Sequence, residues 1–143
     1  MIESLLLVDD EDLFHLVFED CCSLLDITLS LKSLTSSDEA DQLFKNWYLN
    51  SEKKPECVFV DLNMVGSSFD GIELVRRINF EYGNSVVIGI ISSSDESEEQ
   101  AKAIQAGAQF WIVKSEDIEP RLEQFKNEYE GYKNRTAPFK IYK

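Results

Sequence analysis

The chain has 143 residues, which suits a single domain, and 43% of them are hydrophobic, which is near the globular norm. Its 14 Lys and Arg stand against 27 Asp and Glu, and a net charge of −13 repels nucleic acid and anionic lipid. We therefore expect neither a nucleic acid nor a membrane as partner. The sequence lacks a long apolar run and a basic secretory start, and its three cysteines are an odd number without CxxC spacing, so we also expect a cytoplasmic location.

Apolar residues alternate along the chain between short strand-like runs and helical spacing. Strands are expected at residues 5–8, 27–31, 57–60, 86–91 and 110–113. Helices are expected to follow them at residues 14–25, 40–47, 72–78, 100–106 and 118–129. A capping box at Ser36 and Glu39 marks the start of the second helix, and Gly107 suits the end of the fourth.

Strict alternation of strands and helices predicts an α/β fold with a parallel sheet covered by helices on both faces. Continuous apolar runs fit strands buried on both sides, whereas residues 27–31 alternate with polar ones and so suit an edge strand. An edge position for the second strand fits the doubly wound, flavodoxin-like order 2-1-3-4-5. We therefore expect five parallel strands in that order.

Residues 133–143 form a basic tail without helical period, beyond a domain that we place at residues 1–132. The favoured interpretation is a solvated or loosely docked terminus, because chain ends are usually loose. The alternative is a peptide that touches a partner or the acidic body of the protein.

Polar residues stand where the predicted strands end. Asp9 and Asp10 follow the first run, Asp61 the third, Ser92 the fourth and Lys114 the fifth. In open α/β sheets, ligands bind beyond the carboxyl ends of the strands, beside the switch in strand order. These side chains should therefore converge on one rim of the sheet.

The charges of such a rim indicate what it would bind. Two carboxylates about 5 Å apart repel by roughly 3 kcal/mol at an effective dielectric constant near 20. Three carboxylates and one ammonium leave a formal charge of −2, which a hard divalent cation such as Mg²⁺ would neutralise. An incoming phosphoryl group could then reach Asp61, which would act as nucleophile and form an acyl phosphate.

These residues resemble the response-regulator receiver domain of two-component signalling, over about residues 3–131. The segments that carry the resemblance are Leu7-Val8-Asp9-Asp10, Val60-Asp61-Leu62-Asn63-Met64, Asp70-Gly71, Ile91-Ser92, Gln105-Ala106-Gly107-Ala108 and Val113-Lys114. The resemblance implies that Asp61 is the phosphoacceptor and that Ser92 is the switch hydroxyl. It also implies that Lys114 pairs with the phosphoryl group, and it places Trp111 at the aromatic switch position.

The resemblance also implies a Mg²⁺ site. Asp10 and Asp61 match the side-chain ligands of the metal, and Asn63 matches the residue whose backbone carbonyl is a ligand. Asp9 matches the acidic residue that holds metal-bound water. Asp9 and Asp10 could alternatively cap the first helix, since Asp is a favoured N-cap.

The sequence departs from the receiver pattern in three places. Val65 replaces a common proline in a loop that is about two residues longer than usual, which predicts altered mobility. Ser115 replaces the proline of a usual cis bond, so we expect a trans peptide and a less firmly held Lys114. Trp111 is bulkier than the usual aromatic residue, and packing in an edge strand is its alternative role.

We interpret His15 as a surface residue.

Three functions compete. The first is a receiver that takes a phosphoryl group from a histidine kinase or phosphotransfer protein and then presents an altered surface to a downstream protein. That surface, the fourth helix, fifth strand and fifth helix, could also form a homodimer. The second is a degenerate receiver that binds proteins without phosphorylation. The third, a Mg²⁺-dependent phosphohydrolase, is disfavoured because Asn63 replaces the second aspartate of its DxD motif, so we expect no turnover enzyme.

Overall fold

A computed structural model describes residues 1–50, 54–115 and 117–143, and the side chains of residues 48–50 lie outside this description. Its centre is a parallel sheet with strand order β2-β1-β3-β4-β5-β6. The strands are β1 (Ile2–Val8), β2 (Thr28–Leu34), β3 (Cys57–Asp61), β4 (Val87–Ser92), β5 (Phe110–Val113) and β6 (Lys140–Tyr142). The helices are α1 (Asp12–Leu25), α2 (Ser37–Asn50), α3 (Gly71–Tyr82), α4 (Ser97–Ala106) and α5 (Glu119–Lys133).

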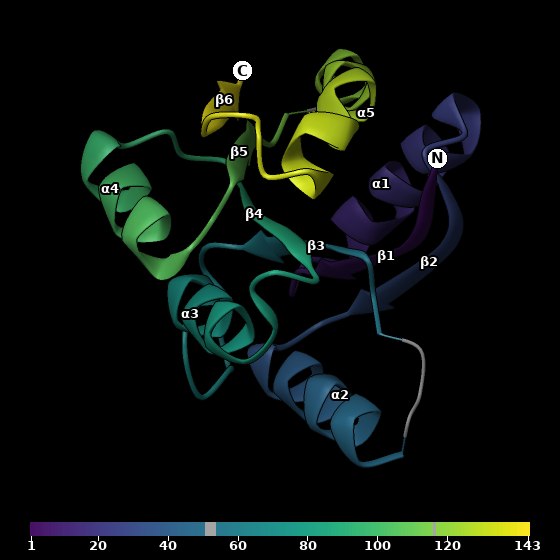
Figure 1. The fold of residues 1–143 in the computed structure, drawn as a ribbon. Helices are drawn as coiled ribbons and strands as arrows, with labels where there is room; N and C mark the ends of the chain where they lie inside the picture. The colour runs from purple at the N-terminus through teal and green to yellow at the C-terminus, as the bar shows by residue number, and fades with distance from the viewer. Residues whose placement is uncertain (51–53, 116) are drawn as a thin grey trace.

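Two layers of helices enclose the sheet, with α1 and α5 on one face and α2, α3 and α4 on the other (Figure 1). Under α1 and α5, the ring of Phe59 lies at the centre of an aromatic cluster. Its centroid is 5.3 Å from that of Phe18 and 5.1 Å from those of Phe110 and Phe125. The opposite layer is mostly aliphatic, and together the two layers fix the strands whose ends carry the acidic residues.

The predicted fold class is confirmed, including the order 2-1-3-4-5 and the edge position of β2. One half of the predicted capping box is present, because the backbone N–H of Glu39 donates to Oγ of Ser36. Gly107 ends α4 with a φ of 112°, a left-handed conformation that glycine adopts without steric cost. In the part of the chain that the structure describes, no helix has the length and apolar character needed to cross a membrane.

The structure differs from the prediction at the C-terminus, where a sixth strand extends the sheet beside β5. The favoured interpretation of residues 133–143 as a loose terminus is wrong for these last residues, because Tyr142 is 1% exposed within the core. Five residues of turn and loop separate the end of α5 from Phe139, and they return the chain to the edge of the sheet (Figure 1). The basic composition of residues 133–143 gave no indication that apolar side chains of this segment pack into both core layers.

Candidate functional site

Three carboxylates meet at the carboxyl ends of β1 and β3, where the strand order switches. Asp9, Asp10 and Asp61 each offer an oxygen, and these oxygens all lie within 4.8 Å of one another. Asp9 is fully buried and Asp61 is 6% exposed. The pairing of β1 with β3 brings these residues together, although about fifty residues separate them along the chain.

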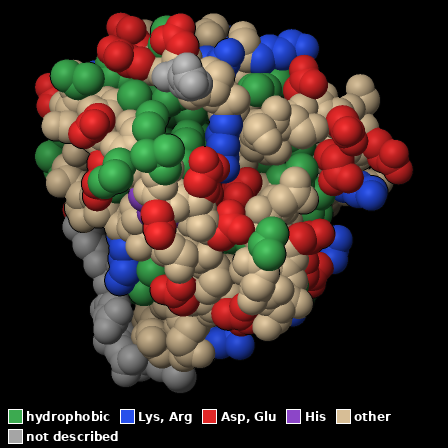
Figure 2. Space-filling model, turned by 180° about the vertical axis from the view of Figure 1, so that it is seen from behind, with side chains coloured by type: hydrophobic (Ala, Val, Ile, Leu, Met, Phe, Trp, Pro, Cys, Tyr) green, Lys and Arg blue, Asp and Glu red, His purple; other side chains and the backbone are tan. Residues whose placement is uncertain are grey.

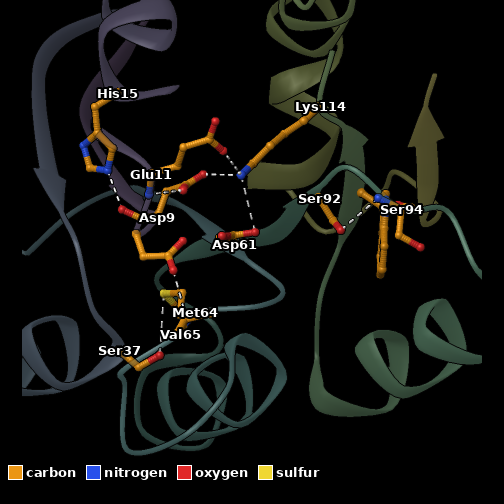
Figure 3. A network of polar contacts seen from close by, with 12 residues as sticks. Asp9, Glu11, His15, Ser37, Asp61, Met64, Val65, Ser92, Ser94 and Lys114 are labelled. Carbon is orange, nitrogen blue, oxygen red and sulfur yellow. Dashed lines mark hydrogen bonds and ion pairs between the residues drawn. The ribbon is translucent and has the colours of Figure 1, made fainter. Parts of the chain in front are cut away.

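Lys114 supplies the positive charge of this cluster from the end of β5 (Figure 3). Its Nζ lies 2.7 Å from Oδ2 of Asp9, 3.5 Å from Oδ1 of Asp61 and 3.6 Å from Oε2 of Glu11. The ring of Phe14 lies beneath the ammonium, with 4.7 Å between Nζ and the ring centroid. Lys114 is therefore held on several sides, and its side chain is only 12% exposed.

The peptide after Lys114 is trans, as expected, and contacts from α5 support the segment around it. The guanidinium of Arg121 donates to the carbonyl of Val113 at 2.8 Å and to Oγ of Ser115 at 2.5 Å. These bonds fasten the segment on both sides of Lys114 to α5. Sequence reasoning missed Arg121 because its position in the last helix gives no sign of this contact.

Burial and crowding shift the ionisation of the central pair. Burial raises the pKa of Asp61 to about 7, and the charges of Asp9 and Asp10 add to this rise while Lys114 opposes it. Burial acts to lower the pKa of Lys114, but its hydrogen bond to Asp9 and the charges of Asp61, Asp9 and Glu11 outweigh that effect and raise it. Lys114 thus stays an ammonium, while Asp61 gains a proton more readily than an exposed carboxyl.

The long loop between β3 and α3 is anchored at three points. The backbone N–H of Val65 donates to Oδ2 of Asp10 at 3.0 Å, and that of Ser68 donates to Oδ2 of Asp38 at 2.9 Å. Oγ of Ser67 accepts from the backbone N–H of Ser37 at 3.0 Å. The start of α2 therefore holds the loop beside the acidic cluster. Ser37 and Asp38 were not predicted as site residues, because their partners lie 30 residues away.

Ser92 and Trp111 meet at one loop beyond β4. Oγ of Ser92, which is buried, accepts a bond of 3.1 Å from the backbone N–H of Ser94 (Figure 3). Nε1 of Trp111 donates to the carbonyl of Ser94 at 2.9 Å, and its side chain is fully buried. Because β6 covers β5, the alternative of Trp111 as an edge-strand residue is wrong.

The remaining predicted residues have clear positions. Asn63 is exposed on the loop after Asp61. His15 was interpreted as a surface residue, but it is half-buried, and its Nε2 lies 2.5 Å from the backbone carbonyl of Asp9. The N-cap of α1 is Glu11, whose own backbone N–H donates to Oδ1 of Asp9. Asp9 and Asp10 are therefore not the N-cap of that helix.

Comparison with known families and structures agrees with this geometry. The sequence model of the response regulator receiver domain matches residues 5–125. The chain belongs to this family. The receiver fold accordingly accounts for the sheet and for the acidic cluster at its carboxyl edge, the kind of site at which receivers bind Mg²⁺.

Solved receivers share the fold at low sequence identity. NtrX from Brucella abortus aligns over 94% of this chain and 28% of its own, with 24% identity and a TM-score of 0.78. The receiver domain of NtrX from Brucella abortus aligns over 87% of this chain and 98% of its own, with 26% identity and a TM-score of 0.66. The Mn²⁺-bound form of response regulator Rcp1 has 15% identity and a TM-score of 0.76, over 89% and 94% of the two chains.

The chain thus spans less than a third of the longer NtrX structures that it matches. The comparison with curated protein sequences gives no match.

Proposed function

We propose that this receiver accepts a phosphoryl group on Asp61 from a phosphohistidine of a histidine kinase or phosphotransfer protein. The observation that carries the proposal is the convergence of Asp61 with two further carboxylates and Lys114 at the switch point of the sheet. A carboxylate in such a position is both a nucleophile and, with its neighbours, a ligand set for a hard cation.

The residues present fit Mg²⁺, because three carboxylates lie within reach of one ion and outnumber the nearby ammonium. Asp10, Asp61 and the backbone carbonyl of Asn63 would hold the ion, and Asp9 would hold its water. When bound, Mg²⁺ neutralises the local charge and polarises the phosphoryl oxygens. Its binding also competes with protonation of Asp61, whose pKa is raised.

The transfer itself is a single displacement. A carboxylate oxygen of Asp61 attacks the phosphorus, the P–N bond to the donor imidazole breaks, and its electron pair stays on that nitrogen. Lys114, already 3.5 Å from Asp61, would stabilise the charge on the phosphoryl oxygens. The hydroxyl of Ser92 stands at the end of the neighbouring strand and would turn to donate to the new group.

The surface around this site suits a protein as phosphodonor. Leu13 and Leu16 on α1 are 68% and 59% exposed, and Val65 on the anchored loop is 88% exposed. Figure 2, in which the single histidine is purple, shows apolar and acidic side chains side by side on this face. Exposed apolar side chains next to a reactive group indicate docking of another protein.

The output would be a changed surface for a downstream protein, on the side of the molecule formed by α4, β5 and α5. The net charge of −13 disfavours nucleic acid as the target. A homodimer through this side remains a prediction, and β6 would form part of its surface.

The test is incubation of the full chain with Mg²⁺ and acetyl phosphate, followed by intact-mass measurement. We expect a gain of one phosphoryl group that EDTA and Asp61→Asn abolish. Asp70→Asn is the matched control, because Asp70 is an exposed carboxyl that caps α3, a role that asparagine retains. This control should gain the group as the wild type does.

An unshifted mass would instead support the degenerate receiver, a module that binds proteins without phosphorylation. Val65 and Ser115 are the residues that favour this alternative. Steady release of p-nitrophenol from p-nitrophenyl phosphate would indicate a turnover phosphohydrolase and contradict the switch.

A further inference from the structure

The strand β6 occupies the outer edge of β5, which would otherwise be the open edge of the receiver sheet. Trp111 is in register with Ile141, and Ile112 with Tyr142. Ile141 packs toward the core under α2, α3 and α4, whereas Tyr142 enters the aromatic core under α1 and α5. The last residues of the chain thus cover the side of the molecule on which the output surface is expected (Figure 1).

Polar anchors hold this short strand at its two ends. The hydroxyl of Tyr142 lies 2.8 Å from that of Tyr132 and donates to Oε1 of Glu128 at 2.7 Å. Nζ of Lys140 lies 2.9 Å from the same oxygen. Just beyond the C-terminal end of the strand, Nζ of Lys143 lies 3.4 Å from Oδ2 of Asp95. Basic residues of the tail therefore meet acidic residues of the body.

One loop connects these anchors to the phosphorylation site. It begins at Ser92, beside the strand that ends in Asp61, and Oγ of Ser92 holds the backbone N–H of Ser94. The carbonyl of Ser94 accepts a hydrogen bond from the indole of Trp111, a residue of the strand that pairs with β6. The carboxylate of Asp95 forms an ion pair with Lys143. A continuous set of polar contacts thus leads from the site to the tail.

This arrangement makes the position of the loop depend on Ser92. When the hydroxyl of Ser92 turns to a phosphoryl oxygen, Ser94 loses the geometry of its present bond. The carbonyl that anchors Trp111 and the carboxylate that anchors Lys143 then move with the loop. The Lys143 and Asp95 side chains are 62% and 53% exposed, so their ion pair is weak and small displacements break it.

We propose that phosphorylation of Asp61 releases β6 from the edge of β5. The inference rests on the proposed function, since it names the element through which that site acts. In the resting protein, residues 139–143 occupy the β5 edge, and in the phosphorylated protein they leave it. Three residues of pairing suit this role, because short edge strands open far more easily than the core.

Hydrogen exchange of the full chain tests the release. The protein is treated with Mg²⁺ and acetyl phosphate, and its intact mass and the exchange of peptides covering residues 139–143 are measured on the same sample. We expect exchange of the β6 amides to rise at least about fivefold with phosphorylation. Peptides of β1 and β3 should not change, and Asp61→Asn should show no rise. A phosphorylated protein whose β6 exchange is unaltered would overturn the proposal.

A second arm works without a phosphodonor and separates the two proposals. Ser92→Ala removes the acceptor for Ser94 and should speed β6 exchange about twofold. Ser93→Ala is the matched control, because Ser93 is exposed and next in sequence. If the mass stays unshifted but Ser92→Ala speeds exchange, phosphotransfer is refuted and the connection to the tail stands. Equal exchange in the two variants would overturn the connection.

Discussion

At the scale of single residues, the site is governed by like charges that the fold forces together. Asp9 is fully buried, and Lys114 is its ion-pair partner at 2.7 Å. Removing one member of a buried pair leaves the other charge uncompensated, which costs more than the pair contributes. The same physics makes the site receptive to a cation and sensitive to the loss of its lysine.

Lys114→Gln tests the role of the ammonium. We expect phosphorylation by acetyl phosphate to slow by about 10- to 100-fold, because one charge that stabilises the phosphoryl oxygens is lost. Mg²⁺ affinity should stay equal or rise, because the variant site is more negative. The rate of mass gain and a Mg²⁺ titration of tryptophan fluorescence measure the two effects. Lys102→Gln, an exposed change on α4, should alter neither.

The raised pKa of Asp61 predicts a pH dependence of stability in metal-free protein. Because this pKa is about 7 in the folded chain and near 4 in an unfolded one, the folded state binds the extra proton between these values. The folding stability that the neutral form of Asp61 contributes is present at low pH and is lost as pH rises through about 7. Asp61→Asn, which cannot ionise, should therefore exceed the wild type by on the order of 1–2 kcal/mol above that pH.

Urea unfolding in EDTA at both ends of this range measures the difference. Near pH 4 the two proteins should differ only slightly in stability, because Asp61 of the wild type is then neutral in the folded state and only about half ionised in the unfolded state. A difference that is constant over the range would contradict the raised pKa.

At the scale of elements, the ends of strands and helices position the reactive residues. Gly71 begins α3, and its backbone N–H donates to the carbonyl of Leu62 at 3.1 Å. A Cβ at Gly71 would lie 2.0 Å from the backbone oxygen of Asp61. The first turn of α3 therefore packs directly against the strand end that presents the phosphoacceptor.

Gly71→Ala should consequently push the end of β3 away from its place. We expect a loss of at least about 2 kcal/mol of stability and slower phosphorylation, measured by urea unfolding and by mass gain. Gly66→Ala is the control, because Gly66 has a φ of +85° with nothing near its Cβ position. That change should cost about 1 kcal/mol through backbone strain, with phosphorylation unaffected. Equal phosphorylation of the two variants would contradict the role of this packing.

At the scale of the whole molecule, the C-terminal strand joins the two core layers and borders the predicted output side. Its contacts come from α5, β5 and the loop after β4, which no local sequence pattern brings together. Because a small domain unfolds cooperatively, weakening this strand should lower the free energy of global unfolding as well as that of local opening.

Tyr142→Phe keeps the buried ring and removes its hydroxyl bonds to Tyr132 and Glu128. We expect a loss of about 1–2 kcal/mol in urea unfolding and faster exchange of the β6 amides. Tyr129→Phe removes a comparable bond from α5 to Glu56. It should reduce stability by a similar amount without speeding exchange in β6. Faster exchange in both variants would show that β6 opens only by global unfolding.

The sequence by itself determined the fold class, the order of the first five strands and the members of the acidic site. Alternating strand and helix periods predicted a parallel sheet. The polar alternation of residues 27–31 placed the second strand at an edge, which fits the order 2-1-3-4-5. Asp9, Asp10, Asp61 and Lys114 could be named because carboxyl ends of parallel strands share one edge.

The tertiary structure alone decided what holds this site and what covers the sheet. Arg121 fastens the segment around Lys114, Asp38 anchors the long loop, and Tyr142 closes the β5 edge. Each of these contacts joins residues that no helical or strand period relates, and a basic tail has the composition of a solvated end. Such contacts depend on the distances between elements after packing, which periodicity along the chain does not contain.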